Sequence, residues 1–164
     1  MSSQSFFHDY FETITGSLDG VDPEALERAV EMVRHTHGSG NKVILVGNGG
    51  SAAMASHVAV DLTKTAGIRA INFNEADLLT CFANDYGYEN WVVKALEFYA
   101  DPGDLVVLIS SSGASQNIIN GAEKANTMGL AVISLSGFSP DNPLRRLGKL
   151  NLWAASDSYN IVEM

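Results

Sequence analysis

The sequence contains little cysteine, little positive charge and no long apolar run. Among its 164 residues, 10 are Lys or Arg and 19 are Asp or Glu, so the formal net charge is −9. The basic residues are scattered, which argues against a nucleic-acid partner because binding to a phosphate backbone requires clustered Lys and Arg. Cys81 is the sole cysteine, and a chain that cannot form an internal disulfide fits a reducing compartment.

Two further absences bear on location. Residues 1–15 lack the basic start and the apolar stretch of a signal peptide, and no apolar run approaches the length that spans a membrane. We therefore expect a cytoplasmic protein with no membrane partner. A chain of 164 residues is long enough to bury one core. We expect a single domain over 1–164, with a helical segment at 1–40 and an α/β core at 41–164.

Short apolar runs alternate with helical patterns from Lys42 onward. Apolar runs of this length are typical of buried parallel strands, and the stretches between them are long enough for crossover helices. The pattern therefore predicts an α/β fold in which helices cover both faces of a parallel sheet. The predicted strands cover 43–46, 69–73, 105–109, 130–135 and 150–154, and the predicted helices of this core cover 52–65, 89–100 and 116–128.

Two helices are predicted ahead of this core. The second begins at Asp22-Pro23-Glu24, with Asp22 as its N-cap, and ends at Gly38-Ser39-Gly40. The first ends near Gly16 and carries an aromatic stripe that can pack on its own domain or against another subunit. Because so dense an apolar face is a liability on a monomer, we expect a homo-oligomer, either a dimer or a tetramer. The residues of this stripe are Phe6, Phe7, Tyr10, Phe11 and Ile14.

Two loops of small residues each follow a predicted strand and open a predicted helix. The first loop is Gly47-Asn48-Gly49-Gly50-Ser51-Ala52, and the second loop is Ser110-Ser111-Ser112-Gly113-Ala114-Ser115. Backbone N–H groups in such loops can approach an anion, and the helix dipole adds favourable potential. Because ligands bind at the carboxyl ends of parallel strands, the two loops predict a pocket for a small phosphorylated ligand. No lysine follows either loop, which argues against a Walker-type nucleotide site.

The first loop also has the spacing of a dinucleotide fingerprint, Gly47-x-Gly49-x-x-Ala52, with Glu75 as the acid that would bind a ribose. Against that interpretation, Asn48 and Ser51 place polar side chains inside the turn. We therefore expect no nucleotide cofactor and a phosphate held by hydroxyls and N–H groups. The alternative is that one serine caps the helix and the others are solvated. The candidate donors near the second loop are Ser110, Ser111, Ser112, Ser115 and Asn117.

Two further groups of polar residues can take part in chemistry. His57 and Asp61 are four residues apart on a predicted helix and therefore share a face. Together they can bind a divalent metal or serve as acid and base, although they supply half of a tetrahedral site and can equally be a surface pair. Asn84-Asp85-Tyr86-Gly87-Tyr88 is predicted to be a loop whose amide and carboxylate can bond to sugar hydroxyls, or else a plain turn.

Together with Pro102-Gly103-Asp104, these motifs resemble the SIS (sugar isomerase) domain family in its phosphoheptose isomerase branch. The resemblance implies a three-layer α/β/α domain with a five-stranded parallel sheet, and a homo-oligomer, usually a tetramer, with the N-terminal helices at its contacts. It also implies isomerisation of sedoheptulose 7-phosphate, or a related sugar phosphate, through an enediol. The second class of function is a non-catalytic SIS module that binds a sugar phosphate or a protein partner such as a replication initiator.

The resemblance also implies residue roles. His57 and Asp61 would be catalytic and would bind a divalent metal, with zinc the expected ion and Asp61 the base. This chain departs from the family pattern in three ways: Asp61 stands for Glu, Val162 stands for a glutamine ligand, and the catalytic histidine falls after Met164. The last helix, opening at Tyr159, is cut off within two turns, so we expect the natural chain to continue and the 164-residue form to be inactive. The phosphate would bind Ser110, Ser111, Ser112 and Ser115, and the sugar would contact Asn48, Gly49, Gly50, Ser51, Asn84 and Asp85.

Overall fold

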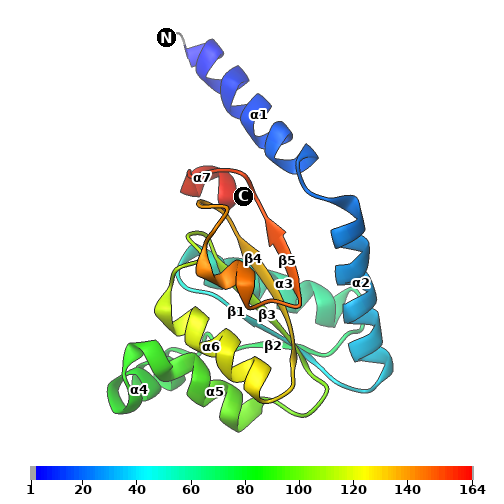
Figure 1. Ribbon diagram of the computed structural model, residues 1–164, viewed down its shortest axis with the longest axis vertical. Helices are drawn as coiled ribbons and strands as arrows, with labels where there is room; N and C mark the ends of the chain where they lie inside the picture. Colours follow the sequence, from blue (N-terminus) through cyan, green and yellow to red (C-terminus); the bar gives the residue numbers. More distant parts are fainter. Residues whose placement is uncertain (1–2, 164) are drawn as a thin grey trace.

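A five-stranded sheet lies between two layers of helices, and helix α1 projects from this body (Figure 1). The computed structural model describes residues 3–163. Its strands are β1 Val43–Val46, β2 Ala70–Asn72, β3 Leu105–Ser110, β4 Ala131–Ser136 and β5 Leu150–Trp153. Its helices are α1 Ser3–Asp19, α2 Pro23–Gly38, α3 Gly50–Lys64, α4 Ala76–Tyr86, α5 Trp91–Tyr99, α6 Gln116–Thr127 and α7 Tyr159–Val162, with short 3₁₀ turns at Tyr88–Asn90 and Pro143–Arg146.

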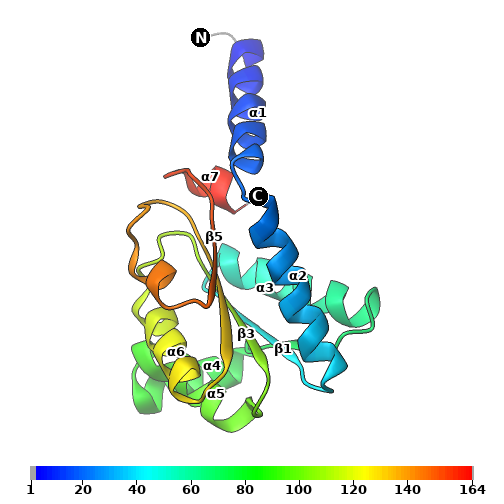
Figure 2. The same ribbon diagram turned by 45° about the vertical axis from the view of Figure 1, so that its right-hand side comes forward.

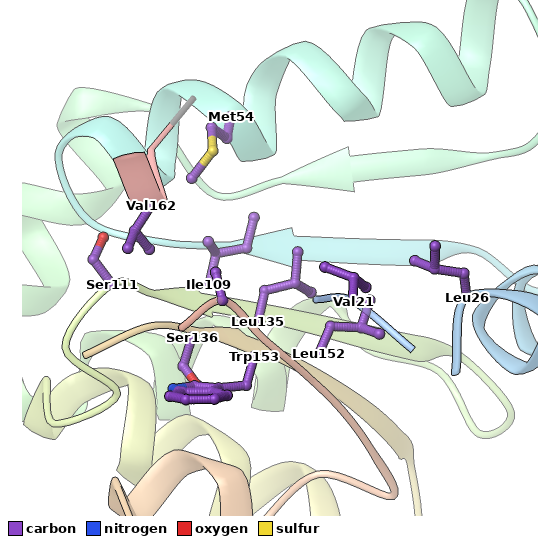
Figure 3. Close-up of a pocket in the computed structure, with 11 residues that line it drawn as sticks. Val21, Leu26, Met54, Ile109, Ser111, Leu135, Ser136, Leu152, Trp153 and Val162 are labelled. Carbon is purple, nitrogen blue, oxygen red and sulfur yellow. The ribbon is translucent and has the colours of Figure 1, made fainter. Parts of the chain in front are cut away.

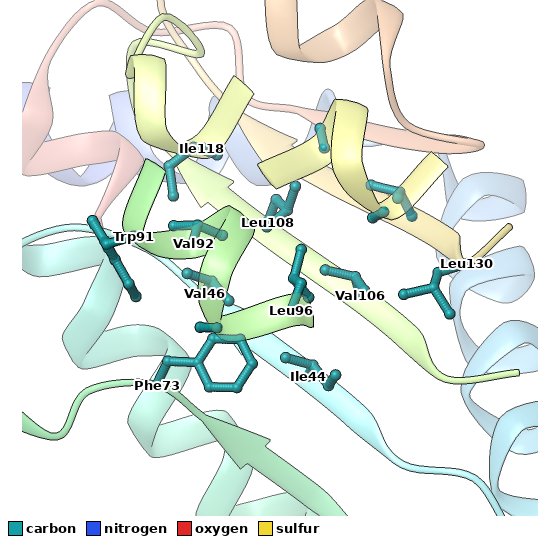
Figure 4. Close-up of a cluster of buried hydrophobic side chains, with 14 of the residues drawn as sticks. Ile44, Val46, Phe73, Trp91, Val92, Leu96, Val106, Leu108, Ile118 and Leu130 are labelled. Atoms are coloured by element: carbon teal, nitrogen blue, oxygen red, sulfur yellow. The ribbon is translucent and has the colours of Figure 1, made fainter. Parts of the chain in front are cut away.

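All neighbouring strands are parallel, in the order β2-β1-β3-β4-β5, which confirms the predicted three-layer α/β fold. Side chains alternate between the two faces of the sheet. On one face, Ile44 and Val46 join Trp91 in a buried cluster that α4, α5 and α6 cover (Figure 4). On the other face, Val43 and Leu45 pack beneath α2 and α3.

The direction in which the chain adds strands to the sheet reverses between β1 and β3. From β1 the chain runs to β2 on one side, and it then returns to β3 on the other side. Connections on opposite faces leave a crevice at such a switch point, beyond the carboxyl ends of the two strands. Both loops of small residues lie there, because the first loop follows β1 and the second loop starts at the last residue of β3.

The N-terminal helices agree with the sequence pattern except at one end. Asp22 caps α2 as predicted, since its side chain accepts a hydrogen bond of 3.0 Å from the Glu24 N–H. Helix α1 runs through Gly16 to Asp19, because a single glycine weakens a helix without ending it. Most of α1 extends away from the sheet (Figure 2), and Phe11 is 61% exposed.

The structure corrects the prediction for residues 84–88. Asn84 and Asp85 lie in the last turn of α4, and only Gly87 breaks the chain before the next turn. This helix was missed because the polar stretch at its end suggested a loop. The helical signal was present in the apolar residues Leu78, Leu79 and Phe82, which pack against the buried cluster of that face. Among residues 3–163, no helix has the length and apolar content needed to cross a membrane.

Candidate functional site

The two loops of small residues form one pocket. A cavity of about 330 Å³ lies between them at the carboxyl ends of β1 and β3. Ile109 lies in its wall, and Tyr159 and Glu163 at the C-terminal end of the described chain close another side. The predicted residues that line it are Asn48, Gly49, Gly50, Ser51, Ser110, Ser111, Ser112 and Ser115.

The backbone of the first loop requires glycine. Gly49 has a φ of +54°, in the left-handed region that disfavours other residues. A Cβ on Gly47 would lie 2.6 Å from the backbone of Ser51, so the chain turns too tightly there for a side chain. Helix α3 then begins at Gly50, and no side chain caps its start. The N–H groups of Ala52 and Ala53 already donate to backbone carbonyls, so the N–H groups of Gly50 and Ser51 and the helix dipole remain available to an anion in the pocket.

The second loop brings hydroxyl groups to the same pocket. Ser110 Oγ and Ser115 Oγ are 3.3 Å apart, and Ser112 Oγ accepts a hydrogen bond of 3.2 Å from the Ala114 N–H. Ser115 stands at the N-cap position of α6, yet its side chain does not cap the helix. The structure therefore does not support the alternative in which one serine caps α6. A second helix start is left open to the pocket.

A reciprocal amide pair joins the two loops. Asn48 Nδ2 donates to Asn117 Oδ1 at 3.0 Å, and Asn117 Nδ2 donates to Asn48 Oδ1 at 2.9 Å. The hydroxyl of Tyr88 also donates to Asn48 Oδ1, at 3.1 Å. Asn117 is 2% exposed and Asn48 is half-buried, so this partly buried pair links the loop after β1 to the start of α6. The pair leaves one N–H of the Asn48 amide for a ligand.

His57 and Asp61 share a face of α3 as predicted, but they do not line the pocket. Their Nε2 and Oδ2 atoms are 3.4 Å apart, and their side chains are 79% and 60% exposed. Within residues 3–163, no group of three or more His, Cys, Asp or Glu residues is placed to hold a metal ion. The two side chains are therefore an exposed pair in this chain.

Asn84 and Asp85 also lie outside the pocket lining. They bond to each other, since Asn84 Nδ2 donates to Asp85 Oδ1 at 2.9 Å. The negative charge of Asp85 raises the pKa of the neighbouring, exposed Cys81 thiol. Glu75, the candidate ribose acid, is likewise absent from the lining, which removes one support for a dinucleotide site.

A second, apolar cavity of about 220 Å³ lies beside the polar pocket (Figure 3). Ser111 and Ile109 line both cavities, and Val162 lies over the apolar one near Met54. Apart from Ser111, Ser136 and Trp153 its walls are aliphatic, so the two cavities differ in chemistry. Val162 thus packs on the apolar side while Glu163, the next residue, faces the polar pocket.

Two residues of the polar pocket had no signal in the sequence. Tyr159 and Glu163 come from the end of the chain, and only the folding of α7 against the sheet brings them to the loops. Tyr88 was part of a predicted loop but had no predicted contact with Asn48. A single sequence records none of these long-range contacts.

Comparison with known proteins agrees with this geometry. The family model described as the SIS domain matches residues 9–137. A phosphoheptose isomerase from Aliarcobacter butzleri is 37% identical over 160 residues, covering 93% of this chain and 84% of the relative. A phosphoheptose isomerase from Helicobacter pylori strain 26695 is 36% identical over 132 residues, which cover 77% of this chain and 68% of the relative.

A solved structure shares the whole fold. The phosphoheptose isomerase GmhA from Neisseria gonorrhoeae superposes with a TM-score of 0.90 at 25% identity, over 99% of this chain and 92% of that one. The family model covers most of the sequence, and the first of these relatives is similar along nearly its whole length. The chain therefore belongs to the SIS domain family, in its phosphoheptose isomerase branch.

Proposed function

We propose that this protein is a sugar-phosphate isomerase whose substrate is sedoheptulose 7-phosphate or a closely related sugar phosphate. The observation that carries the proposal is the pocket between the two loops, where serine hydroxyls and two uncapped helix starts converge. The names of the relatives from A. butzleri and H. pylori support the reaction type. They also disfavour the non-catalytic alternative, because those relatives are named as isomerases.

In this proposal the phosphate group binds between the helix starts. Ser110, Ser112 and Ser115 donate their hydroxyls, together with Ser51 and Ser111 and the N–H groups of the first turns of α3 and α6. Among the described residues, no Lys or Arg lines the pocket. In this proposal hydroxyl and N–H donors therefore bind the phosphate in place of a cationic side chain. Such binding suits a ligand that must be released after each turnover.

The sugar would extend from the phosphate along the first loop. Asn48 would offer its remaining N–H to a hydroxyl or carbonyl oxygen, and Gly49 and Gly50 would let the ligand approach the backbone. Asn117 would hold the Asn48 amide in that orientation. Asn84 and Asp85 lie outside the lining, so they would contact only a ligand that extends beyond this pocket.

An enediol pathway requires a base that removes a proton beside the carbonyl carbon. On the family resemblance we assign this role to Asp61, with His57 beside it, although the pair lies outside the lining of the pocket between the two loops. Zinc is the divalent metal that we would expect at this pair, but a tetrahedral site needs four ligands and the described residues supply two here. The pair does not make a complete metal site, so no step of this mechanism passes through a metal.

Assembly is a further part of the proposal. Phe6, Phe7 and Phe11 are each more than half exposed on a helix that extends away from the sheet. Covering this face would stabilise the protein, at about 25 cal/mol for each Å² of apolar surface buried. We therefore propose a homo-oligomer, dimer or tetramer, with α1 in the contact, in a cytoplasmic protein. The 1–40 segment would then serve assembly, and 41–164 would serve catalysis.

The reaction is tested by following sedoheptulose 7-phosphate by NMR with the full-length protein. The proposal predicts interconversion of the ketose with an aldoheptose 7-phosphate. Asp61→Asn keeps the shape of the side chain and removes the base, so turnover should fall by ~10²–10⁴. An unchanged rate in that variant would place the base elsewhere, and no conversion of any sugar phosphate by the wild type would refute the isomerase.

A further inference from the structure

One carboxylate lies inside the polar pocket, and the proposed function gives it no role. Ser111 Oγ donates a hydrogen bond of 2.7 Å to Glu163 Oε1. The other carboxylate oxygen lies over the start of α3, where a Cβ on Gly50 would overlap it. Glu163 therefore sits between the two groups of donors that the pocket offers to a phosphate.

Several contacts fix this placement. Val162 lies so close to Gly137 that a Cβ there would be 2.7 Å from Val162 Cγ2. The Tyr10 hydroxyl of α1 donates to the Asn160 carbonyl oxygen at 3.0 Å. The rings of Tyr159 and Phe138 meet edge to face, with centroids 4.8 Å apart. Helix α7 is thus held by α1 and by the loop that follows β4, and the position of the carboxylate follows from that docking.

The charge at this position acts against a bare anion. Glu163 is the single charged side chain among the described residues that line the pocket. A phosphate bound there would meet a like charge, and it would compete with Glu163 for the Ser111 hydroxyl. A sugar hydroxyl next to the phosphate would instead donate to the carboxylate and gain a charge-assisted hydrogen bond. The carboxylate therefore repels the phosphate of both ligands, and only the sugar phosphate offsets that repulsion, through its hydroxyl.

We infer that Glu163 is a specificity-determining residue, which makes the pocket selective for phosphosugars over inorganic phosphate. The inference rests on the proposed function, since it assigns the phosphate of the ligand to this pocket. It is a case of discrimination by an unfavourable contact with the wrong ligand. Any phosphate cradle made only of hydroxyl and N–H donors would otherwise bind the free anion as readily as the phosphorylated sugar.

The test compares the binding of two ligands by calorimetry. The 164-residue chain, its Glu163→Gln variant and the control Glu123→Gln are each titrated with sedoheptulose 7-phosphate and with inorganic phosphate, at about pH 8, where the phosphate groups are dianions. Glutamine keeps an acceptor for Ser111 and removes the charge. Glu123 is exposed on α6 and belongs to no part of the pocket, so its variant controls for the loss of one negative charge.

We expect Glu163→Gln to bind inorganic phosphate about tenfold more tightly, and its affinity for the sugar phosphate to change much less. The preference for the sugar phosphate should therefore fall about tenfold, with no change in the control. Glu163→Ala should also bind inorganic phosphate more tightly, which guards against an effect specific to glutamine. An unchanged preference in both variants, with the wild type still binding the sugar phosphate, would overturn the inference alone. If the wild type bound neither ligand, the proposed phosphate site would be wrong and the inference with it.

Discussion

Removal of the buried amide of Asn117 should weaken both the fold and the ligand site. Asn117 is 2% exposed, and its amide exchanges two hydrogen bonds with Asn48 across 69 residues of sequence. Asn117→Ala deletes both bonds and leaves the Asn48 amide with the hydrogen bond from the Tyr88 hydroxyl. Because Asn48 borders the pocket, water can satisfy part of what it loses.

The magnitude follows from those two bonds. A neutral hydrogen bond contributes about 0.5–1.5 kcal/mol to stability, so the pair should be worth about 2 kcal/mol. In a domain of this size, 1 kcal/mol shifts the melting temperature by about 2–4 °C, which predicts a decrease of about 4–8 °C. The first loop also loses its tie to α6, so the Asn48 N–H is no longer held toward the ligand. We expect sugar-phosphate affinity to fall about tenfold, which corresponds to about 1.4 kcal/mol.

Calorimetric melting and ligand titration measure the two effects on one sample. Asn120→Ala is the matched control, because Asn120 lies one turn further along α6, where its amide donates at 2.9 Å to the Glu89 carbonyl oxygen and accepts at 2.7 Å from Gln116 Nε2. Both bonds are exposed and water can replace them, so their loss should cost about 1 kcal/mol or less and leave ligand affinity unchanged. Equal effects of the two variants on affinity would refute the role of the amide pair in the site.

Three further predictions concern stability, metal binding and assembly. Burial would raise the pKa of Asp104, but the hydrogen bonds that this carboxylate accepts from Lys42 Nζ and from backbone N–H groups lower that pKa below the usual value. The stability that Asp104 contributes is therefore complete above about pH 4, and it is lost as the pH falls through the lowered pKa. Urea unfolding at a series of pH values should show this loss of stability. Lys42→Met leaves the Asp104 carboxylate buried without its cation and should cost about 3–5 kcal/mol at neutral pH. A wild type whose stability does not fall in acid would contradict the assignment. The 164-residue chain should bind zinc weakly or not at all by calorimetry, and tight binding that is lost in His57→Ala would show that further ligands exist. Phe7→Ser should shift the chain toward monomer in light scattering, whereas a wild type that is already monomeric at micromolar concentration would rule out the proposed contact.

Most of the fold follows from local patterns that the sequence displays. The apolar runs at 43–46 and 105–109 are fully buried strands, as expected for a parallel sheet covered on both faces. The Asp22 cap and the left-handed Gly129 at the end of α6 set helix ends where turn chemistry places them. Helix α4 was missed because the polar residues at its end outweighed a short apolar stripe.

The site was predictable where it depends on backbone and not where it depends on distant contacts. Both loops could be placed because a buried strand, a run of small residues and a helix start follow one another directly in the sequence. The position of Glu163 depends on how α7 docks against Gly137 and on the hydroxyl of Ser111, and no local pattern encodes that packing. His57 and Asp61 share a helical face as their spacing requires, yet spacing alone does not say whether that face meets the pocket.

The central claim is that the two loops hold the phosphate of a phosphosugar. Calorimetric titration of sedoheptulose 7-phosphate into the wild type, Ser112→Ala and Ser115→Ala tests it most directly, because these hydroxyls line the pocket from the loop and from the start of α6. Each lost hydrogen bond to a charged group should cost roughly 1.5–3 kcal/mol of binding free energy. We predict binding by the wild type that weakens by about that amount in each variant. Equal affinity of all three proteins would contradict the account.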